Sequence, residues 1–309
     1  MSKKSIFSDR EIKAWLEQLT GKNDNLGIPG SGFEYMSVKS NSDLRKEFLE
    51  QEKFLKTVFK ETIIEKAPEL VDPNMKLEFI NYGDTQMVYV LTANGKQWSV
   101  LVTQPIWGCG VGLVEFNNLK RLVEICPNVV VKPEYYFTDG TRELYISPYI
   151  YQARCIASQN QGYGVYIPEP IYRFKTFSGD TREVVNKCMV ANLIRLYDEE
   201  NELGIGSCKI GGGDFILEKQ WEQTDKSIDA TLKHMKLIAA REMLPMSFAD
   251  YEQRILCEFP ERTYYRDISE RDPNILINCK NRVEMTFEEI GEGIELGKKL
   301  RKVRSEIKC

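Results

Sequence analysis

The first 75 residues of the chain carry hydrophobic positions at helical spacing. Ile12, Trp15 and Leu19 lie on one face of a predicted helix that begins at a Ser8–Glu11 capping box. After the linker GKNDNLGIPGSG, which is rich in turn-forming residues, a longer helix is predicted to begin at the segment SDL, residues 42–44. Its apolar stripe consists of Leu44, Phe48, Leu55, Val58, Phe59 and Ile63. We therefore expect a helical N-terminal extension over residues 1–75.

From Lys76 onward the spacing of hydrophobic positions becomes that of β-strands. The segments KLEFINYG, QMVYVLTA and KQWSVLVTQ predict three strands, and Asn94-Gly95 predicts a tight hairpin between the second and the third. The segment LVEFNNLKRLVEIC then predicts a helix. Two further strands, in VVVKPEYYFT and ELYISPYIY, are predicted to turn at Asp139-Gly140. Residues 76–151 should thus form a small five-stranded lobe with one helix.

The remainder of the chain, residues 152–309, is predicted to be a larger, mostly helical lobe. Helices are expected in TREVVNKCMVANLIRLY, SIDATLKHMKLIAAREML and SFADYEQRILCEF, and the glycine-rich ELGIGSCKIGGGDFIL should form a loop, a short strand and a second loop. A last helix should begin at a second capping box, made by Thr286 and Glu289. The predicted fold class is α+β, with two lobes behind the helical extension.

Composition and charge narrow the class of partner. The 309 residues are 42% hydrophobic and 28% charged, which is typical of a globular protein, and the formal net charge is −4. This net charge does not indicate binding to nucleic acid or to an anionic membrane. No apolar run approaches the roughly 20 residues that span a bilayer, and Ser8 to Glu11 interrupt any signal-like segment at the start. We expect a cytoplasmic protein that does not enter a membrane.

The cysteines and the histidine exclude several chemistries. The eight cysteines are scattered without a CxxC pair, so we expect reduced and mostly buried thiols rather than disulfides or a zinc site. The single histidine, His234, cannot supply a motif that needs two or three histidines. A tyrosine-rich hairpin near residues 135–151 lies among basic residues, but such tyrosines pack a sheet face more often than they stack nucleic-acid bases.

The predicted order of elements resembles the protein-kinase-like fold over about Lys76 to Arg266. The segment INYGDTQMVYVL stands where the family has its glycine loop, and WSVLVT resembles its lysine-bearing strand. Glu115 or Glu124 lies on the following helix, and SPYIYQ takes the place of the hinge. The resemblance implies a cofactor-binding position at Gly83, the only glycine of this loop.

The resemblance continues into the second lobe. The segment RLYDEEN, residues 195–201, resembles the catalytic-loop frame that runs from the Arg of HRD to its Asn, and Asp214 in KIGGGDFIL resembles the strand followed by the DFG motif. The resemblance therefore implies that Asn201 and Asp214 occupy the two metal-ligand positions.

Other family positions carry different residues in this chain. Val100, Leu101 and Val102 are apolar where the family has a lysine that contacts the phosphates. The catalytic aspartate position is Leu196, with Asp198 two residues further on, and the DFG glycine is replaced by Ile216. The sequence is thus similar to a degenerate, pseudokinase-like member of the family.

Four interpretations stay open at the level of sequence. The first is a non-catalytic, kinase-like interaction or regulatory protein whose partner is another protein. The second is a divergent phosphotransferase dependent on ATP and Mg²⁺, with Asp198 as the base and with Asn201 and Asp214 holding the metal. The third is an assembly subunit that docks through the long helix at Leu44. In the fourth, GGGDF is a tight turn in which Asp214 caps a helix. The sequence indicates no oligomeric state.

Overall fold

The computed structural model describes residues 50–82 except 52 and 56, and residues 86–103, 108–150, 154–155, 179–206, 215–256 and 286–308. These residues belong to two compact units. The first unit contains the described residues from 50 to 116 together with 133–149, and the second contains 117–132 and the described residues from 150 onward. The division falls within one helix, α5 (Val111–Ile125).

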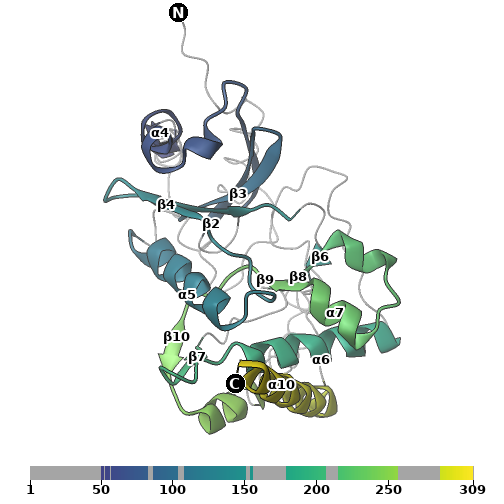
Figure 1. Ribbon diagram of the computed structural model, residues 1–309. Helices are drawn as coiled ribbons and strands as arrows, with labels where there is room; N and C mark the ends of the chain where they lie inside the picture. The colour runs from purple at the N-terminus through teal and green to yellow at the C-terminus, as the bar shows by residue number, and fades with distance from the viewer. Residues whose placement is uncertain are drawn as a thin grey trace, which may run out of the picture. The chain divides into compact units, whose positions relative to one another are not determined.

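The first unit is built on one five-stranded antiparallel sheet (Figure 1). Three of its strands precede α5 in the sequence and two follow it. The strands are β1 (Lys76–Tyr82), β2 (Gln86–Ala93), β3 (Lys96–Thr103), β4 (Tyr135–Thr138) and β5 (Glu143–Pro148). Their spatial order is β1-β2-β3-β5-β4, and α5 follows β3 in the chain. The predicted lobe of three strands, one helix and two strands is confirmed, and the α+β fold class with it.

Both predicted turns form where the sequence places them. Asn94 and Gly95 have φ values of 50° and 73°, the left-handed pair that a two-residue hairpin requires, and Ala93 pairs with Lys96 across it. The Asn94 side chain also donates hydrogen bonds of 2.8 and 3.1 Å to the carbonyls of Glu69 and Val71. The turn therefore joins the sheet to the segment that precedes it.

The described part of the N-terminal extension packs on this sheet. Residues 50, 51, 53–55 and 57 are helical, and the chain continues through a π-helical turn, η1 (Val58–Thr62), to α4 (Ile63–Lys66) and the 3₁₀ turn η2 (Pro68–Leu70). The residues of the extension that are buried in the core of the first unit are Phe54, Leu55, Val58, Phe59, Ile63, Ala67 and Leu70. Their neighbours in that core include Met87, Tyr89, Leu91, Val100, Val102 and Ile146 of the sheet.

This packing changes the interpretation of the long helix. Leu55, Val58, Phe59 and Ile63 are buried against the chain's own sheet, so their side chains are not available to a partner. The other two residues of the predicted stripe, Leu44 and Phe48, lie outside the described residues. The described part of this helix thus covers the chain's own sheet, which needs an apolar cover on this face. Docking of a partner on the long helix, one of the alternatives left open by the sequence, stays a prediction.

The second unit contains two long helices that lie side by side, α6 (Gly179–Arg195) and α10 (Phe287–Lys308) (Figure 1). Glycines let the two backbones approach closely. A Cβ atom on Gly293 would lie 2.7 Å from the Val190 Cβ, and one on Gly297 would lie 2.6 Å from the Ile194 Cβ. Because a larger side chain cannot fit there, these two glycines set the distance between the helices.

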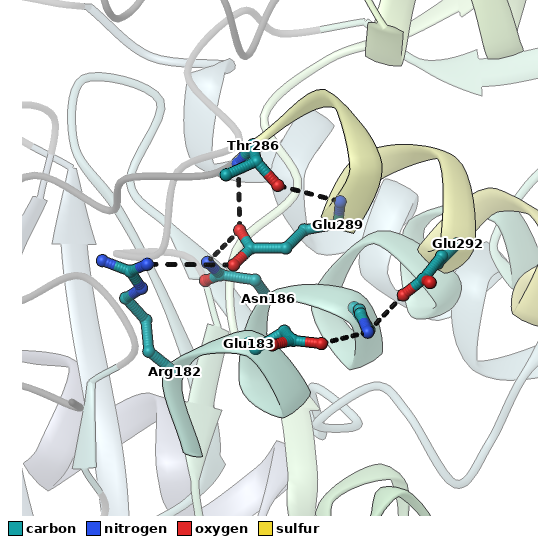
Figure 2. A network of polar contacts seen from close by, with 7 residues as sticks. Arg182, Glu183, Asn186, Thr286, Glu289 and Glu292 are labelled. Carbon is teal, nitrogen blue, oxygen red and sulfur yellow. Dashed lines mark hydrogen bonds and ion pairs between the residues drawn. The ribbon is translucent and has the colours of Figure 1, made fainter. Parts of the chain in front are cut away.

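A polar network fixes the start of α10 against α6 (Figure 2). The Glu289 amide donates to the Thr286 hydroxyl at 3.1 Å, and the Thr286 amide donates to the Glu289 carboxylate at 3.0 Å. The predicted capping box is thus confirmed. The same carboxylate also accepts a 3.0 Å hydrogen bond from Asn186 on α6, and Lys187 bridges Glu183 and Glu292. The cap that begins α10 is therefore also a contact between the two helices.

One predicted helix of this unit is wrong. The expected helix over residues 227–244 ends at His234, because α7 (Ile228–His234) is followed by strand β9 (Met235–Leu237). Met235 and Leu237 are buried and Lys236 is half-exposed, which is the alternation of a strand rather than the spacing of a helix. Pairing with the buried strand β8 (Phe215–Leu217) decides the conformation here, since both strands are too short to be stable alone.

Short strands complete the second unit. β8 pairs on its other side with β6 (Arg154–Cys155), which gives a three-stranded sheet of order β6-β8-β9. A separate pair consists of β7 (Leu203–Ile205) and β10 (Met243–Pro245). A 3₁₀ turn, η4 (Lys219–Gln223), follows β8, and residues 248–256 are helical. The part that was predicted as mostly helical therefore also contains five short strands among its described residues.

Candidate functional site

In the first unit, Glu115, one of the two helix glutamates that the resemblance singled out, accepts a hydrogen bond from an amide side chain. The Gln86 Nε2 atom at the start of β2 donates a hydrogen bond of 2.5 Å to Oε2 of Glu115 on α5. Both side chains are buried. On the neighbouring strand β3, Val100 and Val102 are fully buried in the core of the sheet. Val100 and Val102 are thus part of the packing, and none of the positions 100–102 carries a cationic side chain.

A second buried carboxylate, Glu143 of β5, lies at the start of α5. It accepts hydrogen bonds of 2.6 Å from the Gly112 amide, 3.2 Å from the Leu113 amide and 2.7 Å from the Tyr136 hydroxyl. Burial raises the pKa of Glu143, but the hydrogen bonds from Tyr136 and the helix amides together outweigh it, so this pKa lies below its ordinary value. Glu143 therefore acts as an anionic cap for the free amides of α5.

In the second unit, Asp198 lies in a tight turn between α6 and β7. Its backbone forms a two-way bridge with Leu203, with hydrogen bonds of 2.9 and 3.0 Å. Its carboxylate accepts hydrogen bonds from the Asn201 amide at 3.2 Å and from the Asn201 side chain at 2.9 Å. Arg121 of α5 lies 3.5 Å from the same carboxylate. The predicted base is buried, and three donors already use its oxygens.

The structure brings together two of the four residues that were singled out from the sequence. Asp198 and Asn201 share one turn, with the exposed Asn201 side chain closing on the buried carboxylate. Gly83 and Asp214 lie outside the described residues. Asp214 immediately precedes β8, which begins at Phe215. Asn201, Asp214 and Gly83 stay predictions as cofactor or metal positions, and so does Asp198 as a base.

Sequence reasoning missed the strand β9 and the apolar residues directly after it. The resemblance to a kinase places a metal-binding aspartate directly after a strand. β9 is followed by Ile238, Ala239 and Ala240, whose side chains offer no ligand to a metal. The alternation of Met235, Lys236 and Leu237 is a signal that could have revealed this strand, but helical spacing over the longer segment masked it.

Of the residues predicted to hold ATP and Mg²⁺ or to act as the base, the structure describes Asp198 and Asn201. Magnesium in phosphotransferases is held by carboxylate and amide oxygens beside the phosphates. Here the Asn201 side chain presents its nitrogen to Asp198, and the carboxylate is directed at Arg121 as well. Positions 100–102 of β3 supply no lysine for the phosphates. The described turn is satisfied internally, as a structural turn would be.

The histidine and the described cysteines form no recognisable catalytic group with their described neighbours. His234 lies at the end of α7, and its Nδ1 atom is 2.9 Å from the Glu218 carboxylate, in keeping with a structural histidine. Cys126 and Cys188 are buried, and burial raises the pKa of the Cys188 thiol to about 12. Cys109 is exposed, contrary to the general expectation of buried thiols.

Metal clusters and membrane spans are both absent from the described residues. These residues contain no group of three or more histidine, cysteine, aspartate or glutamate side chains that could hold a metal ion. Within the same part of the chain, no helix combines the length and the apolar character that a membrane span requires.

Comparison with known proteins gave matches among solved structures alone. No family model matches the sequence, and no curated protein matches it. The chain is similar to the autoinhibited serine kinase domain of the giant muscle protein titin, with 12% identity and a TM-score of 0.38, over 59% of this chain and 48% of that one. It is also similar to the BubR1 kinase domain, with 15% identity and a TM-score of 0.38, over 63% of this chain and 60% of that one.

A third match is titin kinase with its flanking domains, at 10% identity and a TM-score of 0.36, over 56% of this chain and 27% of that one. The chain thus covers less than two thirds of each of these structures. In its own strands, it has the predicted kinase-like order of three strands, a helix and two strands in one antiparallel sheet. The described residues therefore have an α+β fold, with the predicted order of strands and helix.

Proposed function

We propose that this chain is a kinase-like interaction or regulatory module that binds another protein and does not transfer phosphate. The hydrogen bond between Gln86 and Glu115 carries this proposal. In protein kinases the equivalent helix glutamate pairs with a lysine that also contacts the phosphates, and both must be in place for transfer. A glutamine side chain is neutral, so it can hold the glutamate but cannot offset phosphate charge. The buried valines of β3 support the same conclusion.

The state of Asp198 also supports a non-catalytic role. A general base must reach the proton that it removes and must have a free oxygen to accept it. The Asp198 side chain is only 6% exposed, and it already accepts hydrogen bonds from Arg121 and from two nitrogens of Asn201. Three donors of this kind favour a carboxylate that organises a turn.

Titration with nucleotide tests this proposal. Thermal unfolding of the full chain is measured with and without millimolar ATP and Mg²⁺, and we expect no shift of the midpoint, since a ligand that binds the folded state would raise it. A midpoint that rises with Mg²⁺·ATP in the parent chain, together with ADP release that is lost in Asp214→Asn, would overturn the non-catalytic proposal. Asp180→Asn, at an exposed aspartate at the start of α6, is the matched control.

The competing proposal is a divergent ATP- and Mg²⁺-dependent phosphotransferase. The observation in its favour is that Asp198 and Asn201 lie together, with 2.9 Å between the Asn201 Nδ2 and the Asp198 carboxylate. Release of ADP in the presence of a protein acceptor, lost in Asp198→Asn, would support it. Because asparagine keeps one of the two oxygens that accept hydrogen bonds from Asn201, this variant should retain part of the hydrogen bonding of the turn while removing the base.

The assembly alternative is tested separately, by the mass of the chain in solution. Burial of the helix stripe within the first unit favours a chain that does not self-associate through that helix. A monomer at micromolar concentration is the expected result, and a stable oligomer would favour an assembly subunit instead.

A further inference from the structure

The turn that carries Asp198 is held by an arginine of the last helix. Arg301 on α10 donates hydrogen bonds of 2.7 Å to the Ile194 carbonyl and 3.1 Å to the Tyr197 carbonyl, and it forms an ion pair with Glu199. Its guanidinium also lies over the rings of Tyr197 and Phe248, at 5.4 and 4.8 Å from their centroids. Arg301 thus contacts the residues immediately before and after Asp198, and it caps carbonyls at the end of α6.

A second arginine holds the same turn from α5. Arg121 lies 3.5 Å from the Asp198 carboxylate, and Asp198 is its one ion-pair partner among the residues that the structure describes. The turn between these two arginines is stiff, because Asp198 bonds to Leu203 in both directions and its carboxylate bonds to Asn201. A displacement on the Arg301 side therefore moves Asp198 together with its neighbours rather than bending the turn.

We propose that the turn from Leu196 to Leu203 is a coupling element, through which the docking of α10 controls the order of residues 117–125 of α5. When α10 is seated, Arg301 fixes the turn and Asp198 faces Arg121. When α10 lifts, the Tyr197 carbonyl and Glu199 lose their partner, and α5 loses a stable acceptor for Arg121. A protein that binds α10 and displaces it would lower the order of residues 117–125 of α5 through this turn, whether or not the chain binds nucleotide.

Hydrogen exchange of the full chain tests the coupling. Arg301→Ala should speed exchange about tenfold at backbone amides in residues 196–206 and also in residues 117–125, as expected when a charge-assisted hydrogen bond is lost from a local opening equilibrium. Lys298→Ala is the matched control, since Lys298 also lies on α10 but pairs with Glu252 and Glu295, away from the turn. It should leave exchange in residues 117–125 unchanged.

A second substitution shows whether Asp198 and Arg121 carry the effect. In an Arg121→Gln background the addition of Arg301→Ala should no longer speed exchange in residues 117–125. An undiminished rise in that background, or a rise confined to α6 and α10 in the single variant, would overturn the proposal. If Arg301→Ala does not fold, Arg301→Lys is used, because it keeps a positive charge near Glu199 and loses the paired contacts with the two carbonyls. The same two outcomes, measured with Arg301→Lys, would then overturn the proposal.

Discussion

Gln86 of β2 donates a hydrogen bond of 2.5 Å to the carboxylate of Glu115 on α5, with both side chains buried in the first unit. The contact joins the sheet to the helix through a neutral amide.

The Gln86–Glu115 contact should contribute measurably to stability. Gln86→Leu removes the donor and leaves the buried carboxylate without this charge-assisted hydrogen bond, so the free energy of unfolding should fall by about 2 kcal/mol. Urea denaturation measures the change. Gln97→Leu, at an exposed position of β3, is the control and should change stability by less than about 0.5 kcal/mol. An equal loss in the two variants would contradict the structural role of this contact.

Acid should weaken the first unit through Glu143. Because its folded-state pKa lies below its ordinary value of 4.5, the contribution of Glu143 is present above that value and is lost as pH falls through the folded-state pKa. Tyr136→Phe removes one donor, which should cost about 1 kcal/mol at neutral pH, raise the folded-state pKa of Glu143 and so make the loss of stability between neutral and acid pH smaller. Urea midpoints across the acid range measure both effects. Tyr135→Phe, on the same strand, should leave the pH profile unchanged.

The glycines between α10 and α6 should not tolerate a methyl group. Alanine at position 293 or 297 would place a Cβ within 2.7 Å of a side-chain carbon on α6, so each substitution should destabilise the second unit by about 1–3 kcal/mol. Gly291→Ala is the matched control, because a Cβ there meets no atom within 4 Å. This control should raise stability by up to about 1 kcal/mol, as alanine does in an open helix position. Urea denaturation measures these changes in the free energy of unfolding, and the diagnostic result is that the two interface variants lose stability whereas the control gains it.

The N-terminal helix should be necessary for the stability of the sheet. Leu55 is fully buried in the core of the first unit, so Leu55→Ala should lower the free energy of unfolding by about 3 kcal/mol. Thr57→Ala, at an exposed position of the same helix, should have an effect of less than about 0.5 kcal/mol. A neutral Leu55→Ala variant with an altered mass in solution would instead indicate a helix that serves a partner.

Local patterns predicted those elements whose hydrophobic residues repeat over several turns or strand positions. The first three strands appear nearly to the residue, because alternating side chains and the Asn94–Gly95 turn fix both the strands and their register. The Thr286–Glu289 cap was equally predictable, since its two hydrogen bonds join residues only three apart. The helix over residues 227–244 was not, because three residues of strand depend on a neighbour that is distant in the sequence.

The candidate site also combines features that local patterns predict with features that depend on contacts between distant segments. The sequence by itself determined the kinase-like order of elements, the apolar positions 100–102 and the placement of Asp198 near Asn201, because composition and spacing are local properties. Only the tertiary structure decided that Gln86 is a partner of Glu115, that Arg121 and Arg301 hold the Asp198 turn, and that the N-terminal helix is part of a core. The physical reason is burial: which polar group a buried carboxylate meets depends on chain segments far apart in the sequence, and no local pattern encodes that choice.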